Sequence, residues 1–127
     1  MQPDLEKLQG RWQIVTLEMD GRAVPSGIFA DAKIIIEGNN FATAGMGASY
    51  SGKISLDQTS HPKKFDVNFS DGPHAGKASL GLYILEQDQW TLCIGLAGYE
   101  RPVDFRTSPQ SGHALETLRR EIDSQFR

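Results

Sequence analysis

The sequence contains a single cysteine, Cys93, and this scarcity excludes two kinds of site. One thiol cannot form a disulfide within the chain, and a metal cluster held by several thiolates needs more cysteines. Positive charge is also in short supply, because 13 Lys and Arg stand against 16 Asp and Glu, for a formal net charge of -3. Such a chain has no global positive field to attract nucleic acid or an anionic membrane. We therefore expect no nucleic-acid partner.

No uninterrupted apolar stretch approaches the roughly 20 residues that a membrane-spanning helix needs, so we expect no membrane insertion. The first ten residues, MQPDLEKLQG, have neither the basic nor the apolar region of a secretory signal. These observations predict a soluble protein that is cytoplasmic, unless a leader has been removed. Its 127 residues fit one domain, residues 1–127.

Short stretches of alternating apolar and polar residues recur about every ten residues, with Gly, Asn, Asp or Pro between them. A period of two is typical of β-strands that are buried on one face. The strands expected from this pattern are Arg11–Glu18, Lys33–Gly38, Phe41–Met46, Ser49–Leu56, Lys64–Phe69, Ser79–Glu86, Gln89–Leu96 and Pro102–Thr107. Asp20 and Gly21 predict a tight turn after the first strand, and Ala23–Ala32 fits a loop or one short helical turn.

The segment HALETLRREIDSQF, residues 113–126, is ambiguous. Its residues Leu115, Leu118, Ile122 and Phe126 follow the spacing of an amphipathic helix. A sheet of about eight short antiparallel strands must, however, close into a barrel or stack as a sandwich to protect its edges. Because closure satisfies two edges at once, we expect a strand at about Ala114–Arg120, followed by a frayed or helical end. Periodicity alone does not choose between barrel and sandwich.

Three spaced motifs favour the barrel: LQGRWQIVTLEMDGRAVP, DGPHAGKASLGLYIL and LCIGLAGYERPVDF. In this order, from Leu8 to about Arg120, they resemble a family of short, uncharacterised bacterial domains that are numerous in Planctomycetes. The resemblance implies an all-β, lipocalin-like (calycin-type) up-and-down barrel of about eight strands. It also implies that Gly10 and Trp12 close one end, with Arg101 or, in our assignment, Arg106 covering the indole by cation–π attraction. The charged segment after residue 113 departs from the hydrophobic last strand of that family.

A barrel of eight strands is just wide enough to hold one small ligand, so we expect a small apolar or amphipathic molecule in the lumen. The candidate ligand-binding residues are Tyr50, Tyr83, Cys93 and Arg101. Strand alternation points Tyr83 and Cys93 away from their immediate neighbours, so that either this pair or those neighbours line the lumen. The rival hypothesis is a solid barrel, filled by its aromatic residues, that serves as a structural or protein-interaction module.

No constellation predicts an enzyme mechanism, a cofactor or a metal site. Asp66 and Asp104 are expected to point to solvent, so no pair of carboxylates converges for acid–base catalysis. An enzyme would instead need Tyr83, Arg101 and a carboxylate in one cleft. The histidines, His61, His74 and His113, all lie in turns or links, where solvated side chains are expected. The loop DGPHAGK leads into a strand, and it lacks the spacing and the following helix of a phosphate-binding loop.

Overall fold

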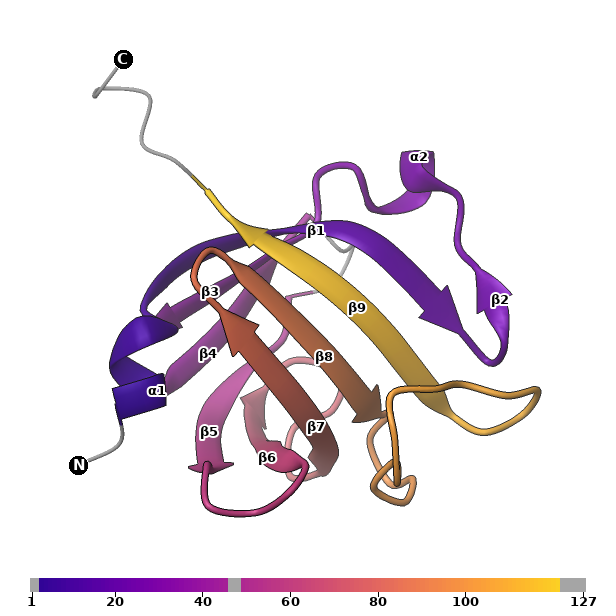
Figure 1. Cartoon of the computed structure of the whole chain (residues 1–127). Coiled ribbons are helices and arrows are strands. Elements are labelled where there is room, and N and C mark those ends of the chain that lie inside the picture. Colours follow the sequence, from indigo (N-terminus) through magenta and orange to yellow (C-terminus); the bar gives the residue numbers. More distant parts are fainter. Residues whose placement is uncertain (1–2, 46–48, 122–127) are drawn as a thin grey trace.

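The computed structural model describes residues 3–45 and 49–121, and eight of its strands close into an antiparallel barrel (Figure 1). Neighbouring strands follow one another in the order β1-β3-β4-β5-β6-β7-β8-β9, and β9 pairs back onto β1. The elements are α1 (Pro3–Lys7), β1 (Gly10–Met19), β2 (Arg22–Ala23), α2 (Ser26–Phe29), β3 (Lys33–Glu37), β4 (Asn40–Ala44), β5 (Ser51–Asp57), β6 (Lys63–Asp71), β7 (Ala78–Glu86), β8 (Gln89–Gly95) and β9 (His113–Arg120). The all-β barrel expected from the sequence is confirmed.

Closure of the barrel depends on β9, the segment whose local pattern was ambiguous. It pairs with β8 on one side and with β1 on the other, from Trp12 opposite Arg120 to Met19 opposite Ala114. A bulge at Val15 bends β1 around the closure. The predicted strand at Ala114–Arg120 is therefore confirmed, because satisfying two sheet edges outweighs the local helical spacing. The predicted frayed or helical end after Arg120, and Met46 of a predicted strand, lie mostly or wholly outside the described residues.

The first turn and the first loop of the structure also agree with the sequence-based expectations. Asp20 and Gly21 both have positive φ, 51° and 83°, as the tight turn between β1 and β2 requires. Gly is favoured in that region because it has no Cβ, and Asp tolerates it. The expected helical turn within Ala23–Ala32 is α2. A second short helix, α1, precedes β1, in keeping with the short N-terminal helical turn expected as part of the fold class.

One predicted strand is wrong. Pro102–Thr107 lies in the long segment between β8 and β9, outside any strand. Its alternating residues have no edge to join, because β8 is already paired with β7 on one side and with β9 on the other. The segment packs instead against the outside of the barrel, where the carbonyl oxygen of Arg106 lies 3.6 Å from the sulfur of Cys93.

A dense aromatic cluster fills the end of the barrel that α1 covers, which we call the closed end. Trp12 and Trp90 meet edge to face with ring centroids 5.5 Å apart, and Phe65 lies 5.3 Å from Trp90. All three side chains are completely buried. The Trp12 indole also donates a hydrogen bond of 2.9 Å to the carbonyl of Leu8, which ties the chain after α1 to the barrel. The opposite end, called the open end, carries α2 and the links between β6 and β7 and between β8 and β9 (Figure 1).

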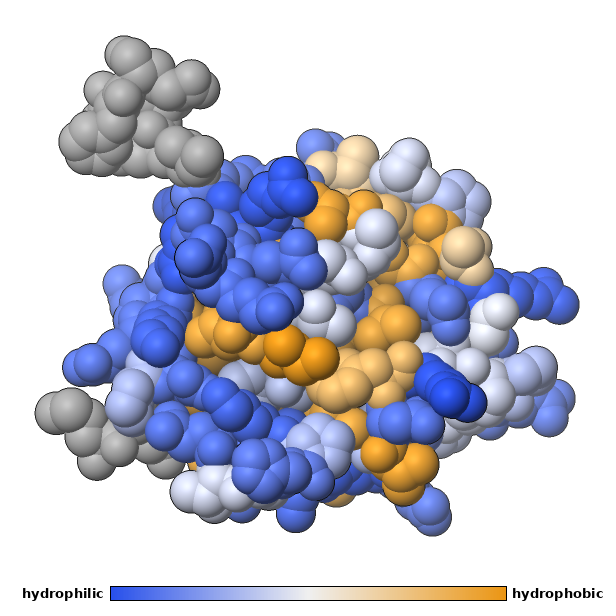
Figure 2. Space-filling view, in the orientation of Figure 1, coloured by the Kyte–Doolittle hydropathy of each residue, from blue (hydrophilic) through white to orange (hydrophobic). Residues whose placement is uncertain are grey.

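The outer wall is partly apolar. Figure 2 shows apolar residues gathered on the face formed by β7, β8 and β9, and a shallow hollow of about 310 Å³ lies there among residues that include Ile84, Phe105 and Leu115. Ile84 is 42% exposed. None of the helices in the described parts of the chain is long and apolar enough to cross a membrane.

Candidate functional site

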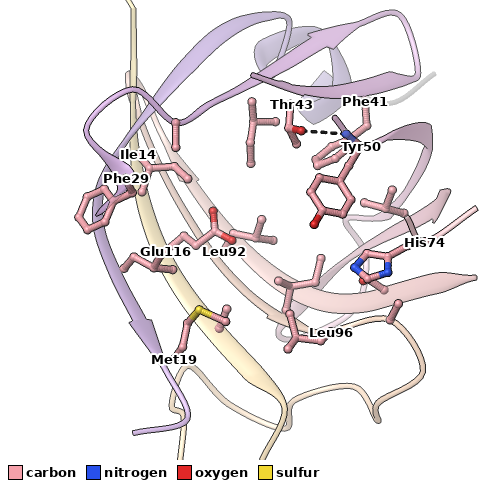
Figure 3. Close-up of a pocket in the computed structure, with 18 of the residues that line it drawn as sticks. Ile14, Met19, Phe29, Phe41, Thr43, Tyr50, His74, Leu92, Leu96 and Glu116 are labelled. Atoms are coloured by element: carbon pink, nitrogen blue, oxygen red, sulfur yellow. Dashed lines mark hydrogen bonds between the residues drawn. The ribbon is translucent and has the colours of Figure 1, made fainter. Parts of the chain in front are cut away.

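Above the closed-end cluster the barrel is hollow. A cavity of about 520 Å³ occupies the half of the lumen nearer the open end, and Figure 3 shows side chains pointing into it from several strands. Its lining is predominantly apolar: Ile14, Leu17, Met19, Ile28, Phe29, Ala32, Ile34, Phe41, Val67, Phe69, Leu92, Ile94, Leu96, Ala97 and Ala114. The barrel is therefore filled at one end and hollow at the other. The polar groups in the hollow half are few, and their positions determine what the cavity can bind.

Glu116 is the only acidic residue among the described residues that line the cavity. Alternation along β9 turns Ala114, Glu116 and Leu118 to the inside, and Figure 3 shows the Glu116 carboxylate pointing into the hollow. Its Oε1 is buried and has no hydrogen-bond partner among the described residues, although the residue as a whole keeps some accessible surface toward the cavity. Burial raises the pKa of this carboxyl from 4.5 to about 7.

Tyr50, a predicted ligand-binding residue, lies on the cavity wall, and its hydroxyl points into the hollow (Figure 3). Its ring lies 5.0 Å from that of His74, at an interplanar angle of 32°, and 6.2 Å from that of Phe69. The backbone N–H of Tyr50 donates a hydrogen bond of 3.1 Å to Thr43 Oγ1, which holds the backbone of Tyr50 against β4. Tyr50 is therefore held by contacts with three residues, His74, Phe69 and Thr43.

His74 was expected to be a solvated loop histidine, and this is wrong. The turn between β6 and β7 folds back, since the N–H of Gly76 bonds to the carbonyl of Phe69 at 2.9 Å. This brings the half-buried His74 ring onto Phe69 and Tyr50, where it lines the cavity. Periodicity within strands carries no information about a side chain in a turn, so the sequence offered no signal for this placement.

Tyr83 lies inside the barrel but not at the cavity. It is 1% exposed at the closed end, where its hydroxyl donates a hydrogen bond of 2.7 Å to Asp4 Oδ2, and Lys63 Nζ donates to the same oxygen at 2.9 Å. Burial, followed by the contact with Asp4, raises the pKa of Tyr83. For Asp4, burial acts to raise the pKa, but the bonds from Tyr83 and Lys63 outweigh it and the pKa is lowered. Tyr83 thus belongs to the packed end.

Cys93 does not share a face with Tyr83, contrary to the pairing considered from the sequence. The register places Leu82 opposite Cys93 and Tyr83 opposite Leu92, so Cys93 is on the outer face. It is nevertheless completely buried, because the link between β8 and β9 covers it. Burial raises the pKa of its thiol to about 11. The residue is a covered hydrophobic side chain on the outer face of the wall, and it is not among the residues that line the cavity.

Arg101 is also on the outside of the wall. Its guanidinium pairs with Asp66 at 2.5 and 3.0 Å and donates to the carbonyl of Gly81 at 2.9 Å. Asp66 therefore does not simply point to solvent, as expected, but fastens the link that covers β6 and β7. Because Arg101 is outside the barrel and Tyr83 inside, the structure does not bring these two residues into one cleft.

Trp12 lies at the closed end of the barrel, and the cation over its indole differs from the one expected. Arg120, not Arg101 or Arg106, covers the indole of Trp12, with its guanidinium carbon 4.4 Å from the ring centroid. Arg120 is opposite Trp12 in the β1–β9 register, and it also donates to the carbonyl of Gln9 at 2.7 Å. The Arg106 side chain is 83% exposed and its nearest acidic partner, Asp104, is 3.6 Å away.

Gly10 has the conformation that this closure needs. Its φ is 119°, and a Cβ added there would lie 3.4 Å from Nη1 of Arg120. The contact would be an ordinary one, so the positive φ, which glycine adopts readily and other residues rarely do, is the reason that favours glycine here.

Within residues 3–45 and 49–121, no three His, Cys, Asp or Glu side chains gather to hold a metal ion. No protein-family model, curated protein or solved structure matches the chain significantly. The fold is therefore defined by the strand topology alone, and the cavity is the feature of the structure that bears on function.

Proposed function

We propose that the protein binds a small apolar or amphipathic molecule inside the open half of its barrel. The observation that carries this proposal is the apolar cavity of about 520 Å³. Its volume lies in the range of roughly 300–1,000 Å³ that is usual for small-molecule sites. An apolar lining with a few polar groups is also typical of such sites. A core built only for stability is packed with few voids larger than a water molecule.

Apolar and polar groups of the lining would contribute to binding in different ways. Burial of an apolar ligand body against Ile14, Phe41 and Leu92 supplies about 25 cal/mol for each Å² removed from water. Tyr50 and His74 offer a hydroxyl and an imidazole at the rim of the hollow half, where a ligand's polar end would meet them. This arrangement suits a molecule that has one apolar and one polar part.

The rival function is a structural or protein-interaction module. The observation that favours it is the outer face of β7, β8 and β9, where Ile84 is 42% exposed beside the shallow hollow. A partner would then cover the wall, and the lumen would bind nothing.

A fluorescent apolar probe distinguishes the two functions. N-phenyl-1-naphthylamine, which is uncharged, should bind the purified protein saturably with an increase in emission. Ala114→Phe, which places a ring in the cavity, should weaken this binding by about tenfold or more, since losing well-packed apolar contacts costs more than about 1.4 kcal/mol. Ile84→Phe, the matched control on the outer face, should leave it unchanged.

Circular dichroism of each variant verifies that it is folded before binding is compared. Absence of saturable binding to the folded wild-type protein, or equal binding by Ala114→Phe, would overturn the proposal. Binding that Ile84→Phe weakens and Ala114→Phe does not would favour the rival function.

A further inference from the structure

We propose that the cavity selects ligands whose apolar body carries a protonated amine, and that the Glu116 carboxylate is the anchor for that amine. This inference rests on the proposed function, because it names the class of molecule that enters the same cavity. Its basis is the contrast between Glu116 and the acidic residues elsewhere in the barrel.

Two other acids that are at least half-buried in the barrel or against its wall, Asp4 and Asp66, both have partners. Asp4, buried at the closed end, accepts hydrogen bonds from Tyr83 and Lys63. Asp66, on the outer wall, is held by both terminal nitrogens of Arg101. A buried carboxylate that is paired in this way is tolerated, whereas an unpaired one is costly. This protein therefore meets the general requirement at both of these positions.

Glu116, in contrast, has no such partner for its buried carboxylate oxygen among the described residues. Its Oε1 is buried without a hydrogen-bond donor, and neither Lys nor Arg is among the described residues that line the cavity. Its inward neighbours on β9, Ala114 and Leu118, are apolar, so the wall itself gives no structural reason for a carboxylate at this position. The missing partner is supplied if it arrives with the ligand.

The chemistry of the missing partner follows from the charge. A ligand carboxylate would be repelled, and an alcohol would donate one hydrogen bond without compensating the charge. An ammonium group does both, and a hydrogen bond between two ionised groups is about twice as strong as a neutral one. A divalent cation would require further ligands, and the described residues bring no second acid or cysteine to this cavity.

The raised pKa of Glu116, about 7, agrees with such a role. A cation placed beside the carboxylate favours its ionised form and would lower this pKa again. The other titratable groups in the described lining are His74 and Tyr50, on the side of the cavity formed by β5 and the β6–β7 turn. A protonated His74 would act against an amine, in the same direction as a protonated Glu116.

The test is displacement of bound N-phenyl-1-naphthylamine by octylamine, 1-octanol and octanoate, which share a chain and differ in the head group. Compared with wild type, Glu116→Gln should require a concentration of octylamine about tenfold higher or more, because the ammonium loses its charged partner. The concentration of 1-octanol required should change by less than about twofold, within the context-dependence of a neutral hydrogen bond. Glu37→Gln, an exposed residue on β3, is the matched control and should behave as wild type.

Each result decides a separate point. If the probe binds and Glu116→Gln shifts octylamine no more than 1-octanol, the amine inference is overturned while the proposed function stands. If the folded wild-type protein does not bind the probe, the proposed function falls and this inference with it. As a second readout, octylamine should bind wild type less tightly at about pH 5 than at about pH 8, and His74→Gln should retain most of this difference. Loss of the pH dependence in His74→Gln, with its persistence in Glu116→Gln, would assign the effect to the imidazole and overturn the role of Glu116.

Discussion

Replacing Glu116 by glutamine should change how the stability of the ligand-free protein depends on pH. The carboxyl has a pKa of about 7 in the folded state, against 4.5 for a glutamate side chain exposed to water, as in the unfolded chain. Between these two values the folded state binds more protons than the unfolded state, so stability falls as pH rises through this interval. Glutamine does not titrate, and the variant lacks this loss. The free energy of unfolding of Glu116→Gln should therefore gain on that of wild type as pH rises.

The size of the effect follows from the pKa. A rise from 4.5 to about 7, at about 1.4 kcal/mol per pKa unit, sets an upper bound of about 3–4 kcal/mol. The cavity beside Glu116 lets the side chain keep some accessible surface, and hydration through it reduces the cost. We therefore expect the difference between variant and wild type to grow by about 1–3 kcal/mol between about pH 4 and about pH 8.

Urea unfolding followed by tryptophan fluorescence measures this difference, because Trp12 and Trp90 are completely buried and report loss of the closed end. The opposite pH dependence contributed by Asp4, whose pKa is lowered, is common to both proteins and cancels in the comparison. Glu37→Gln controls for the loss of one negative charge. Parallel stability curves for wild type and Glu116→Gln across this pH range would refute the assignment of Glu116 as a buried carboxyl with a raised pKa.

Three further predictions concern the wall and the closed end. Trp12→Ala should lower the free energy of unfolding by about 3–5 kcal/mol in urea titrations, as for other large buried aromatic residues; a loss below about 1 kcal/mol would mean that Trp12 does not hold the core. Arg120→Met should cost about 1–3 kcal/mol in the same assay, because it removes the cation over the indole and charged hydrogen bonds to carbonyls, whereas Arg106→Met should change stability by less than about 0.5 kcal/mol; equal losses would contradict the assignment of the covering cation. Cys93 should react with a water-soluble aromatic disulfide only when the protein is unfolded in urea, since its thiol is covered and has a pKa of about 11; rapid reaction of the folded protein would contradict this burial.

The barrel was predictable because its signals are local or follow from a single global rule. Alternation of residues located the strands, and the pair Asp20–Gly21 located a turn whose positive φ angles need such residues. The need to pair both free edges of the sheet then predicted a strand at Ala114–Arg120, although the local spacing of its apolar residues is helical. The same rule did not reject a strand at Pro102–Thr107, which is excluded by the direct pairing of β8 with β9.

The site was less predictable, because strand alternation gives a face but neither the depth along the barrel nor the register with the neighbour. Tyr50 and Tyr83 both lie inside, yet one is at the cavity and the other is packed under α1. The positions of Cys93 and Arg101 could not be predicted without knowing the register between β7 and β8 and the path of the long link between β8 and β9. Glu116 did have a signal: once its segment is a strand, alternation from Leu118 turns it inward, but the helical spacing of Leu115 and Leu118 concealed this.

The two ends of the barrel differ in how they treat a buried carboxylate, and this difference bears on function. Asp4 at the closed end has two donors, in the same half of the barrel as the aromatic cluster around Trp12 and Trp90. The open half instead holds a cavity and an acid whose Oε1 has no partner among the described residues, a combination that costs stability. A leucine at position 116 would fill part of the hollow and abolish the unpaired charge. If Glu116→Leu proves more stable than wild type at neutral pH and loses octylamine binding, the carboxylate is retained at the expense of stability, as expected of a binding group.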